Sequence, residues 1–132
     1  DFCYGNEFTD DTMNEIITAM DKEYIKGFSL LGGEPFEKEN RETVKYILKT
    51  IKGRFPNKTV WCYSGFTFEE LVGECEDILK YIDVLVDGAF VAEKKNLKLK
   101  FRGSENQRII NVKKSLEDKT VTELTEGEYD EY

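Results

Sequence analysis

A turn of two glycines, a glutamate and a proline is the part of this sequence whose residue types most directly suit chemistry. It follows the short apolar segment 28–31 and precedes a long amphipathic segment. Gly32 and Gly33 let the backbone approach a ligand that a Cβ atom would keep away. Glu34 adds a fixed carboxylate, and Pro35 stiffens the exit of the turn. The turn therefore suits a ligand that carries an amine or another cation.

The same turn differs from phosphate-binding loops. It lacks the third glycine of a dinucleotide-binding fingerprint and the Lys-Ser/Thr pair of a P-loop. Its carboxylate would also repel a phosphate. A Gly-Gly pair after a strand is, by itself, most often a simple tight turn. Two interpretations therefore remain at this point, a cation-binding site and a plain connection.

Apolar strand-like segments alternate with amphipathic helical segments as far as residue 88. The third helical segment begins at a capping box of Thr67 and Glu70 and is interrupted near Gly73. The predicted strands are 28–31, 60–63 and 84–87, with a possible final strand at 109–112. This order predicts an α/β fold with a parallel sheet and right-handed crossovers. Such a chain normally begins with a strand, so a first strand-helix unit is expected to be missing.

Small or acidic residues stand where the predicted strands end. Gly32, Ser64 and Asp87 each directly follow or end an apolar strand. The carboxyl ends of parallel strands meet at one edge of a sheet, and α/β sheets bind their ligands there. We therefore expect these three residues on one rim, which is the predicted binding site.

The polar segment 102–108 precedes the possible final strand. It is dense in planar hydrogen-bond donors, which come from Arg102, Asn106, Gln107 and Arg108. A loop of this composition either contacts a ligand or partner or is a solvated surface connection. Both interpretations stay open from the sequence.

Length and charge limit the classes of protein to which this chain can belong. Its 132 residues suit one domain, which we predict over residues 1–119. Residues 123–132 hold five acids and no base out of a net charge of −8, so 120–132 are predicted as a flexible acidic tail. A nucleic-acid partner is not expected, because no long basic stripe is present. The sequence also shows neither a membrane-length apolar run nor a signal-peptide pattern, which predicts a cytoplasmic protein without a membrane partner.

The chain has no histidine and three cysteines, Cys3, Cys62 and Cys75. The lack of histidine excludes a Ser-His-Asp triad, a Cys-His nucleophile pair and the common His-bearing zinc sites. The cysteines are far apart and form no Cys-x-x-Cys pair, so they indicate neither a disulfide framework nor a local metal site. Cys62 and Cys75 are expected to be small buried apolar residues.

Three motifs in this order resemble one known family. They are LLGGEP after a strand, DVLVDGAF at a strand end and RGSENQR before the final strand. The segment FPNKTVWCYSGFTFEEL is similar to a strand-turn-helix of the same family. The family is that of the activating proteins of anaerobic ribonucleoside-triphosphate reductase, which are small radical S-adenosylmethionine enzymes. The resemblance runs from Asp1 to about Leu116 and implies a partial (β/α) barrel.

The resemblance also implies a 4Fe-4S cluster, held by three cysteines in a C-x3-C-x2-C loop after the first strand. That loop is expected before Asp1, and Cys3 does not replace any of its cysteines. The cluster is therefore expected in the intact protein only. The chain as given is expected to hold no metal and to be inactive alone.

The chemistry that the resemblance implies begins with a reduced cluster bound to the amino and carboxylate groups of S-adenosylmethionine. One electron, supplied by a donor such as flavodoxin, passes to the sulfonium, and the bond breaks to methionine and a 5′-deoxyadenosyl radical. This radical takes hydrogen from a glycine of the reductase large subunit. The turn 32–35, with Glu34, would meet the methionyl amino group. Ser64 and Asp87 would approach the methionyl carboxylate or the ribose, directly or through a bound cation.

Three other functions stay open from the sequence. An activase for another glycyl-radical enzyme, such as pyruvate formate-lyase, shares most of these features, although the segment 102–108 favours the reductase. A non-catalytic, flavodoxin-like binding module would use Asp87 as a phosphoryl acceptor. Against this, the acidic pair after a first strand and the strand-end lysine of such modules are not seen. The last alternative is an inactive homologue that serves as an interaction surface.

Overall fold

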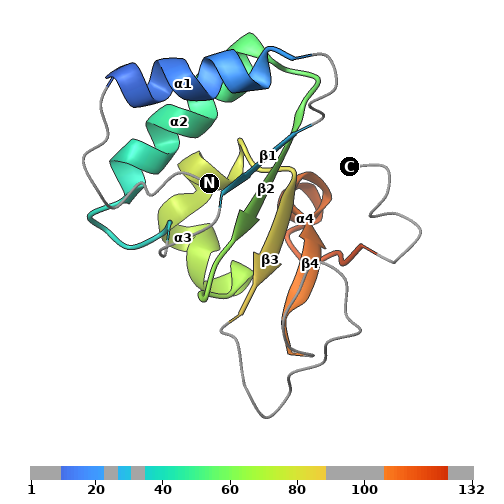
Figure 1. Cartoon of the computed structure of the whole chain (residues 1–132). Helices are drawn as coiled ribbons and strands as arrows, with labels where there is room; N and C mark the ends of the chain where they lie inside the picture. Colours follow the sequence, from blue (N-terminus) through green and yellow to red (C-terminus); the bar gives the residue numbers. More distant parts are fainter. Residues whose placement is uncertain (1–9, 23–26, 31–34, 89–105, 125–132) are drawn as a thin grey trace.

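Eight helices and strands make up the described part of the protein, which comprises residues 10–22, 27–30, 35–88 and 106–124 of a computed structural model (Figure 1). Their order is α1 Asp10–Met20, β1 Gly27–Leu30, α2 Arg41–Arg54, β2 Thr59–Tyr63, α3 Phe68–Leu79, β3 Val84–Asp87, β4 Arg108–Asn111 and α4 Val112–Asp118. The alternation of helices and strands that the apolar pattern predicts is present as far as β3. Among the described helices, none combines the length and apolar character needed to cross a membrane.

The four described strands form one sheet in the order β1-β2-β3-β4. β1 pairs with β2 in parallel, and β2 pairs with β3 in parallel, as the sequence predicts. β4 pairs with β3 antiparallel and places Arg108 opposite Asp87. The final strand, expected at 109–112, lies one residue earlier because Asn111 ends it and caps α4 by accepting a hydrogen bond from the Lys114 N–H. The sheet is therefore mixed, and the partial (β/α) barrel stays a prediction.

The helices α1 to α4 all contribute to one core on one face of this sheet. Alternate strand residues join the helical side chains there, namely Val60, Cys62, Leu85 and Ile110. The neighbouring strand residues Trp61, Val84, Val86 and Ile109 form a second buried cluster on the other face, together with Leu124 from the segment after α4. β2 and β3 are therefore buried on both faces, as their continuous apolar sequences predict.

Helix α3 begins at the capping box that the sequence predicts. The Thr67 hydroxyl accepts a hydrogen bond from the Glu70 N–H, and the Glu70 carboxylate accepts one from the Thr67 N–H at 3.0 Å. The interruption expected near Gly73 is present two residues further on, at Cys75, where φ is −121° and ψ is 21°. Gly73 is exposed, and a Cβ atom there would meet nothing within 4 Å, so this position suits a regular helix. The capping-box hydrogen bonds thus fix the first turn of α3, which lies N-terminal to the kink.

We expect Gly73→Ala to stabilise the chain by about 0.5–1 kcal/mol, because alanine reduces the entropy of the unfolded backbone and has space in the folded helix. Gly27→Ala is the matched control. A Cβ atom at Gly27 would lie 2.4 Å from the Thr59 carbonyl oxygen, so this variant should lose stability. Urea unfolding followed by circular dichroism measures both changes. A less stable Gly73→Ala variant would show that the kink requires glycine.

Residues 120–124, which the sequence places in the acidic tail, run along the edge of the sheet beside β4. The Asn111 N–H donates to the Thr122 carbonyl oxygen at 2.8 Å, and the Leu124 N–H donates to the Ile109 carbonyl oxygen at 2.8 Å. The Leu124 side chain is buried in the second cluster. The beginning of the predicted tail therefore packs with the domain, and the rest of it lies outside the described residues.

Candidate functional site

The carboxyl ends of β2 and β3 lie side by side next to the first turn of α3. The Ser64 N–H donates to the Val86 carbonyl oxygen at 3.0 Å. The Gly88 N–H donates to the Phe66 carbonyl oxygen at 3.2 Å. These bonds continue the contact between the two strands past their ends. The structure thus brings Ser64 and Asp87 to one rim of the sheet, as the strand pattern predicts.

Ser64 shapes the turn that leads from β2 into α3. Its side chain is buried, and its Oγ accepts a hydrogen bond from the Phe66 N–H at 3.0 Å. A serine hydroxyl that binds the backbone two residues further on is typical of such turns. Gly88 meets this turn from the end of β3 with a φ of 93°, which favours glycine. Both residues therefore help to form the rim.

Asp87 is the most enclosed charged group of the rim, with an exposed fraction of 1%. Its Oδ2 accepts a hydrogen bond at 2.8 Å from the N–H of Phe68, the first residue of α3. The Arg108 guanidinium donates from Nε to Oδ1 at 3.0 Å and from Nη2 to Oδ2 at 2.5 Å. Both carboxylate oxygens are therefore engaged within the protein.

Arg108 also binds a second carboxylate, that of Glu69 in the first turn of α3. Nη2 donates to Oε1 at 2.5 Å, and Nη1 donates to Oε2 at 3.2 Å. The hydrogen bonds to Asp87, followed by those to Glu69, raise the pKa of the Arg108 guanidinium, and the hydrogen bond from Arg108 lowers the pKa of Glu69. The guanidinium is thus held, fully charged, between a buried carboxylate and one whose side chain is 62% exposed.

The polar segment 102–108 is described from Asn106 onward, and this part folds back on the end of β3. The Gln107 Nε2 donates to the Gly88 carbonyl oxygen at 3.0 Å. Asn106 lies against Gly88, with its Nδ2 3.7 Å from the place a Cβ atom of that glycine would take. Gln107 therefore supports the rim from within the protein, and Arg102 lies outside the described residues.

The network of Arg108, Asp87 and Glu69 does not follow from the sequence, which places Arg108 in a polar loop that either contacts a ligand or partner or is a solvated connection. Arg108 and Asp87 are 21 residues apart, and Arg108 and Glu69 are 39 apart. The one available signal is the presence of opposite charges at the ends of two predicted strands. That signal becomes specific only when the antiparallel register of β4 is known.

Of the turn 32–35, only Pro35 is among the described residues. Pro35 and Phe36 are buried, and the Phe36 carbonyl oxygen accepts a hydrogen bond from the Arg41 Nε at 2.8 Å. The Arg41 Nη2 also donates to the Glu74 carboxylate of α3 at 3.2 Å. The start of α2 is therefore tied to α3, the helix that begins at the rim. The role of the glycines and the glutamate of this turn stays a prediction.

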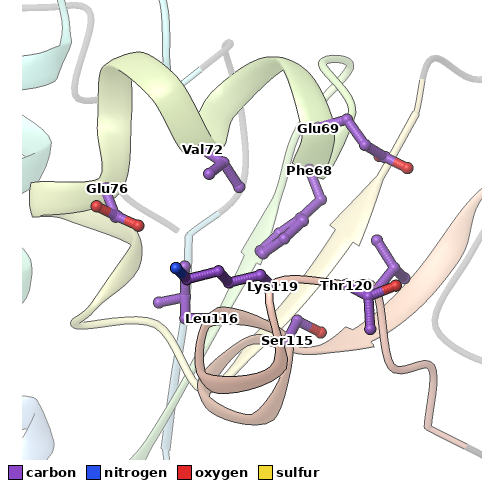
Figure 2. A pocket seen from close by; sticks show the side chains of 9 residues that line it. Phe68, Glu69, Val72, Glu76, Ser115, Leu116, Lys119 and Thr120 are labelled. Atoms are coloured by element: carbon purple, nitrogen blue, oxygen red, sulfur yellow. The ribbon is translucent and has the colours of Figure 1, made fainter.

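A separate pocket of about 560 Å³ lies between α3 and α4, on the helical side of the sheet. Figure 2 shows the Phe68 ring between these two helices, with Glu69 and Glu76 toward opposite ends of the α3 wall. The other apolar side chains of its lining are Val72, Leu116 and Val121. The pocket shares Glu69 with the rim network, but neither Ser64 nor Asp87 lines it.

Comparison with known proteins places the chain in a family. The profile of a family described as a 4Fe-4S single cluster domain matches residues 1–110. The anaerobic ribonucleoside-triphosphate reductase-activating protein of Enterobacteria phage T4 is 39% identical to this chain over 107 residues, and that of Vibrio cholerae is 37% identical over 107 residues. The chain belongs to this family of activating proteins.

The match to these activating proteins covers most of the chain but not all of each relative. It spans 80% of this chain, 65% of the phage protein and 69% of the Vibrio cholerae protein. The activating protein of Escherichia coli strain K12 is 34% identical over 105 residues, which is 78% of this chain and 68% of that protein. The chain thus spans about two thirds of the length of its relatives. No solved structure matches it.

The described residues do not fit the 4Fe-4S cluster that the family description names. Cys62 in β2 and Cys75 in α3 are both buried in the main core, on the helical side of the sheet. Within the described ranges, no three Cys, His, Asp or Glu side chains are grouped as metal ligands would be. Cys62 and Cys75 are therefore small apolar core residues, as the sequence predicts, and Cys3 lies outside the described ranges.

Proposed function

We propose that this protein activates an anaerobic ribonucleoside-triphosphate reductase by a radical S-adenosylmethionine reaction. The observation that carries the proposal is the 39% identity over 107 residues to an activating protein of that reductase, together with the match to a 4Fe-4S domain family. When bound, S-adenosylmethionine and a reduced cluster supply a 5′-deoxyadenosyl radical that takes a hydrogen atom from a glycine of the reductase. The protein binds, orients and shields these reactants.

The rim at the carboxyl ends of the parallel strands supports the proposal, because ligands of α/β sheets bind at this edge. In the proposal, the backbone of the glycine turn approaches the methionyl group and Glu34 accepts hydrogen bonds from its ammonium. The turn at Ser64 borders the methionyl carboxylate or the ribose. Asp87 acts indirectly, since its oxygens already accept hydrogen bonds from within the protein.

The proposed macromolecular partner is the large subunit of the reductase, with a flavodoxin as the proposed electron donor. A contact with the partner or the substrate is one of the two interpretations that the sequence leaves open for the segment 102–108. Gln107 and Arg108 bind groups of this chain, so their side chains support the rim instead of facing a partner. Arg102 and Asn106 remain the candidates of this segment for the partner contact.

An extended protein, in which a first strand and a C-x3-C-x2-C loop from a relative precede Asp1, tests the proposed function. After anaerobic reconstitution and reduction, it should cleave S-adenosylmethionine to methionine and 5′-deoxyadenosine. With an added reductase it should also produce a glycyl radical, which electron paramagnetic resonance detects. Cleavage without this radical would remove the reductase as the partner. Absence of both products would overturn the proposal.

Glu34→Ala should raise the dissociation constant of S-adenosylmethionine for the extended protein by about tenfold or more. A charge-assisted hydrogen bond to an ammonium contributes about 1.5–3 kcal/mol, and about 1.4 kcal/mol corresponds to a factor of ten. Calorimetric titration measures the affinity. The matched control is Glu37→Ala, which removes an exposed carboxylate just after the turn and should leave the affinity unchanged. An unchanged affinity in Glu34→Ala would rule out this role for the glutamate.

A further inference from the structure

Arg108 links three separate segments of the rim. It begins β4, and its guanidinium binds Asp87 at the end of β3 and Glu69 in the first turn of α3. The antiparallel register places Arg108 directly opposite Asp87, so the backbone and the side chains hold the same two residues together. A single guanidinium thus sets the position of the start of α3 relative to the ends of two strands.

The same contacts fasten the turn 64–67, which borders the proposed binding site. Two backbone hydrogen bonds join this turn to the end of β3. A third connection runs from the Phe68 N–H to the Asp87 side chain, and Arg108 fixes the orientation of that side chain with two hydrogen bonds. Loss of Arg108 would therefore loosen the end of the turn that leads into α3.

Arg108 also neutralises the charge of the Asp87 carboxylate, as a bound cation would. A buried carboxylate requires a compensating positive charge or several hydrogen bonds. Here the guanidinium nitrogens stand 3.0 Å from Oδ1 and 2.5 Å from Oδ2. A calcium or magnesium ion would need the same oxygens at about 2.0–2.6 Å, and any metal cation there would lie beside a fixed positive charge. The surroundings of Asp87 therefore do not fit the bound cation that the resemblance allows.

We propose that Arg108 is a positioning residue that fixes the rim for S-adenosylmethionine and takes the place of a metal cation at Asp87. The identity of the ligand as S-adenosylmethionine rests on the proposed function. The pairing of Arg108 with Asp87 and Glu69 rests on the contacts in the structure alone. Arginine is required, because its planar fork binds two carboxylates in a bidentate manner and a lysine ammonium does not. Replacing residues that hydrogen-bond to metal ligands lowers metal affinity by about 10–100-fold. We expect a comparable loss of affinity for S-adenosylmethionine when Arg108 is replaced.

Calorimetric titration of S-adenosylmethionine into the extended, cluster-loaded protein tests the proposal, with choline as the only buffer cation and then with added potassium or magnesium. The unsubstituted protein should bind equally well in all three conditions. Arg108→Gln and Arg108→Lys should both bind about tenfold or more weakly in choline. Potassium or magnesium should restore part of the affinity of Arg108→Gln, since its Asp87 carboxylate lacks a counter-charge. Arg54→Gln, the same substitution at an exposed arginine at the end of α2, is the matched control and should bind like the unsubstituted protein.

Several results would overturn the proposal. An unsubstituted protein that requires potassium or magnesium for binding, or a loss in Arg108→Gln that neither ion reduces, would overturn the replacement of a cation. An Arg108→Gln protein with unchanged affinity would overturn the positioning role. If Arg108→Gln does not fold, the double variant Asp87→Asn with Arg108→Gln buries no charge and decides the question: weaker binding supports positioning, and unchanged binding overturns it.

Amide hydrogen exchange separates this inference from the proposed function, because it needs no ligand. If the unsubstituted extended protein binds no S-adenosylmethionine, the proposed function fails. The positioning role then depends on the Phe68 amide, whose hydrogen bond to Asp87 relies on Arg108. Faster exchange of this amide in Arg108→Gln, with no change in Arg54→Gln, supports the role. Equal exchange in Arg108→Gln and the unsubstituted protein overturns it.

Discussion

Reconstituted with iron and sulfide under anaerobic conditions, the 132-residue chain will hold no 4Fe-4S cluster. Such clusters need several thiolates that converge on the irons. Cys62 and Cys75 have exposed fractions of 0% and lie in the main core, one in a strand and one in a helix. Neither can reach a shared cluster without opening that core. The measurements are the visible absorbance of the cluster and the iron content per chain.

The extended protein is the matched control for this result, and it should hold a cluster through the cysteines of its added loop. β1 lies at one end of the described strand order, where an edge strand presents backbone groups for pairing. The added first strand therefore has a place to bind, and the extended protein should also be the more stable of the two. A stoichiometric cluster on the 132-residue chain would show that its own cysteines are ligands. No cluster on the extended protein would remove the radical-enzyme proposal.

The parallel part of the fold could be predicted from the sequence because its signals are local. Val60–Tyr63 and Val84–Val86 are continuous apolar runs, and amphipathic helices separate the strands. The start of α3 was equally clear from the Thr67–Glu70 capping box. The orientation of β4 was not predictable in the same way, because its short apolar run pairs equally well in either direction until its neighbours are known.

In the candidate site, the positions of the residues could be predicted from the sequence, but their roles could not. The places of Ser64 and Asp87 follow from topology, since strand ends in a parallel sheet share one edge. The role of Asp87 does not follow from topology, because it depends on which group binds its carboxylate oxygens. That group is Arg108, which the sequence presents as one more polar residue of a loop. A charged residue before a strand has the same local sequence whether its side chain faces solvent or a buried partner.

Asp83 provides an enclosed carboxylate at the opposite end of the sheet from Asp87. It directly precedes β3, and its Oδ2 accepts hydrogen bonds from the Val60 N–H at 2.8 Å and from the Lys52 Nζ at 2.5 Å. Lys52 also donates to the Lys58 carbonyl oxygen at 2.9 Å. The side chain of Asp83 is only 8% exposed. This one carboxylate therefore ties α2 and β2 to the start of β3.

Asp83→Ala should lower the free energy of unfolding of the chain by about 3–5 kcal/mol, because it leaves the Lys52 charge enclosed and the buried Val60 N–H without its acceptor. Lys113→Ala is the matched control. The Lys113 ammonium lies 3.4 Å from the same carboxylate but on a side chain that is 65% exposed, so its loss should cost less than about 1 kcal/mol. Urea unfolding at equal protein concentration compares the two variants. Equal, small losses in both would mean that water satisfies Lys52 and Val60 when Asp83 is removed, and that this end of the sheet does not depend on the ion pair.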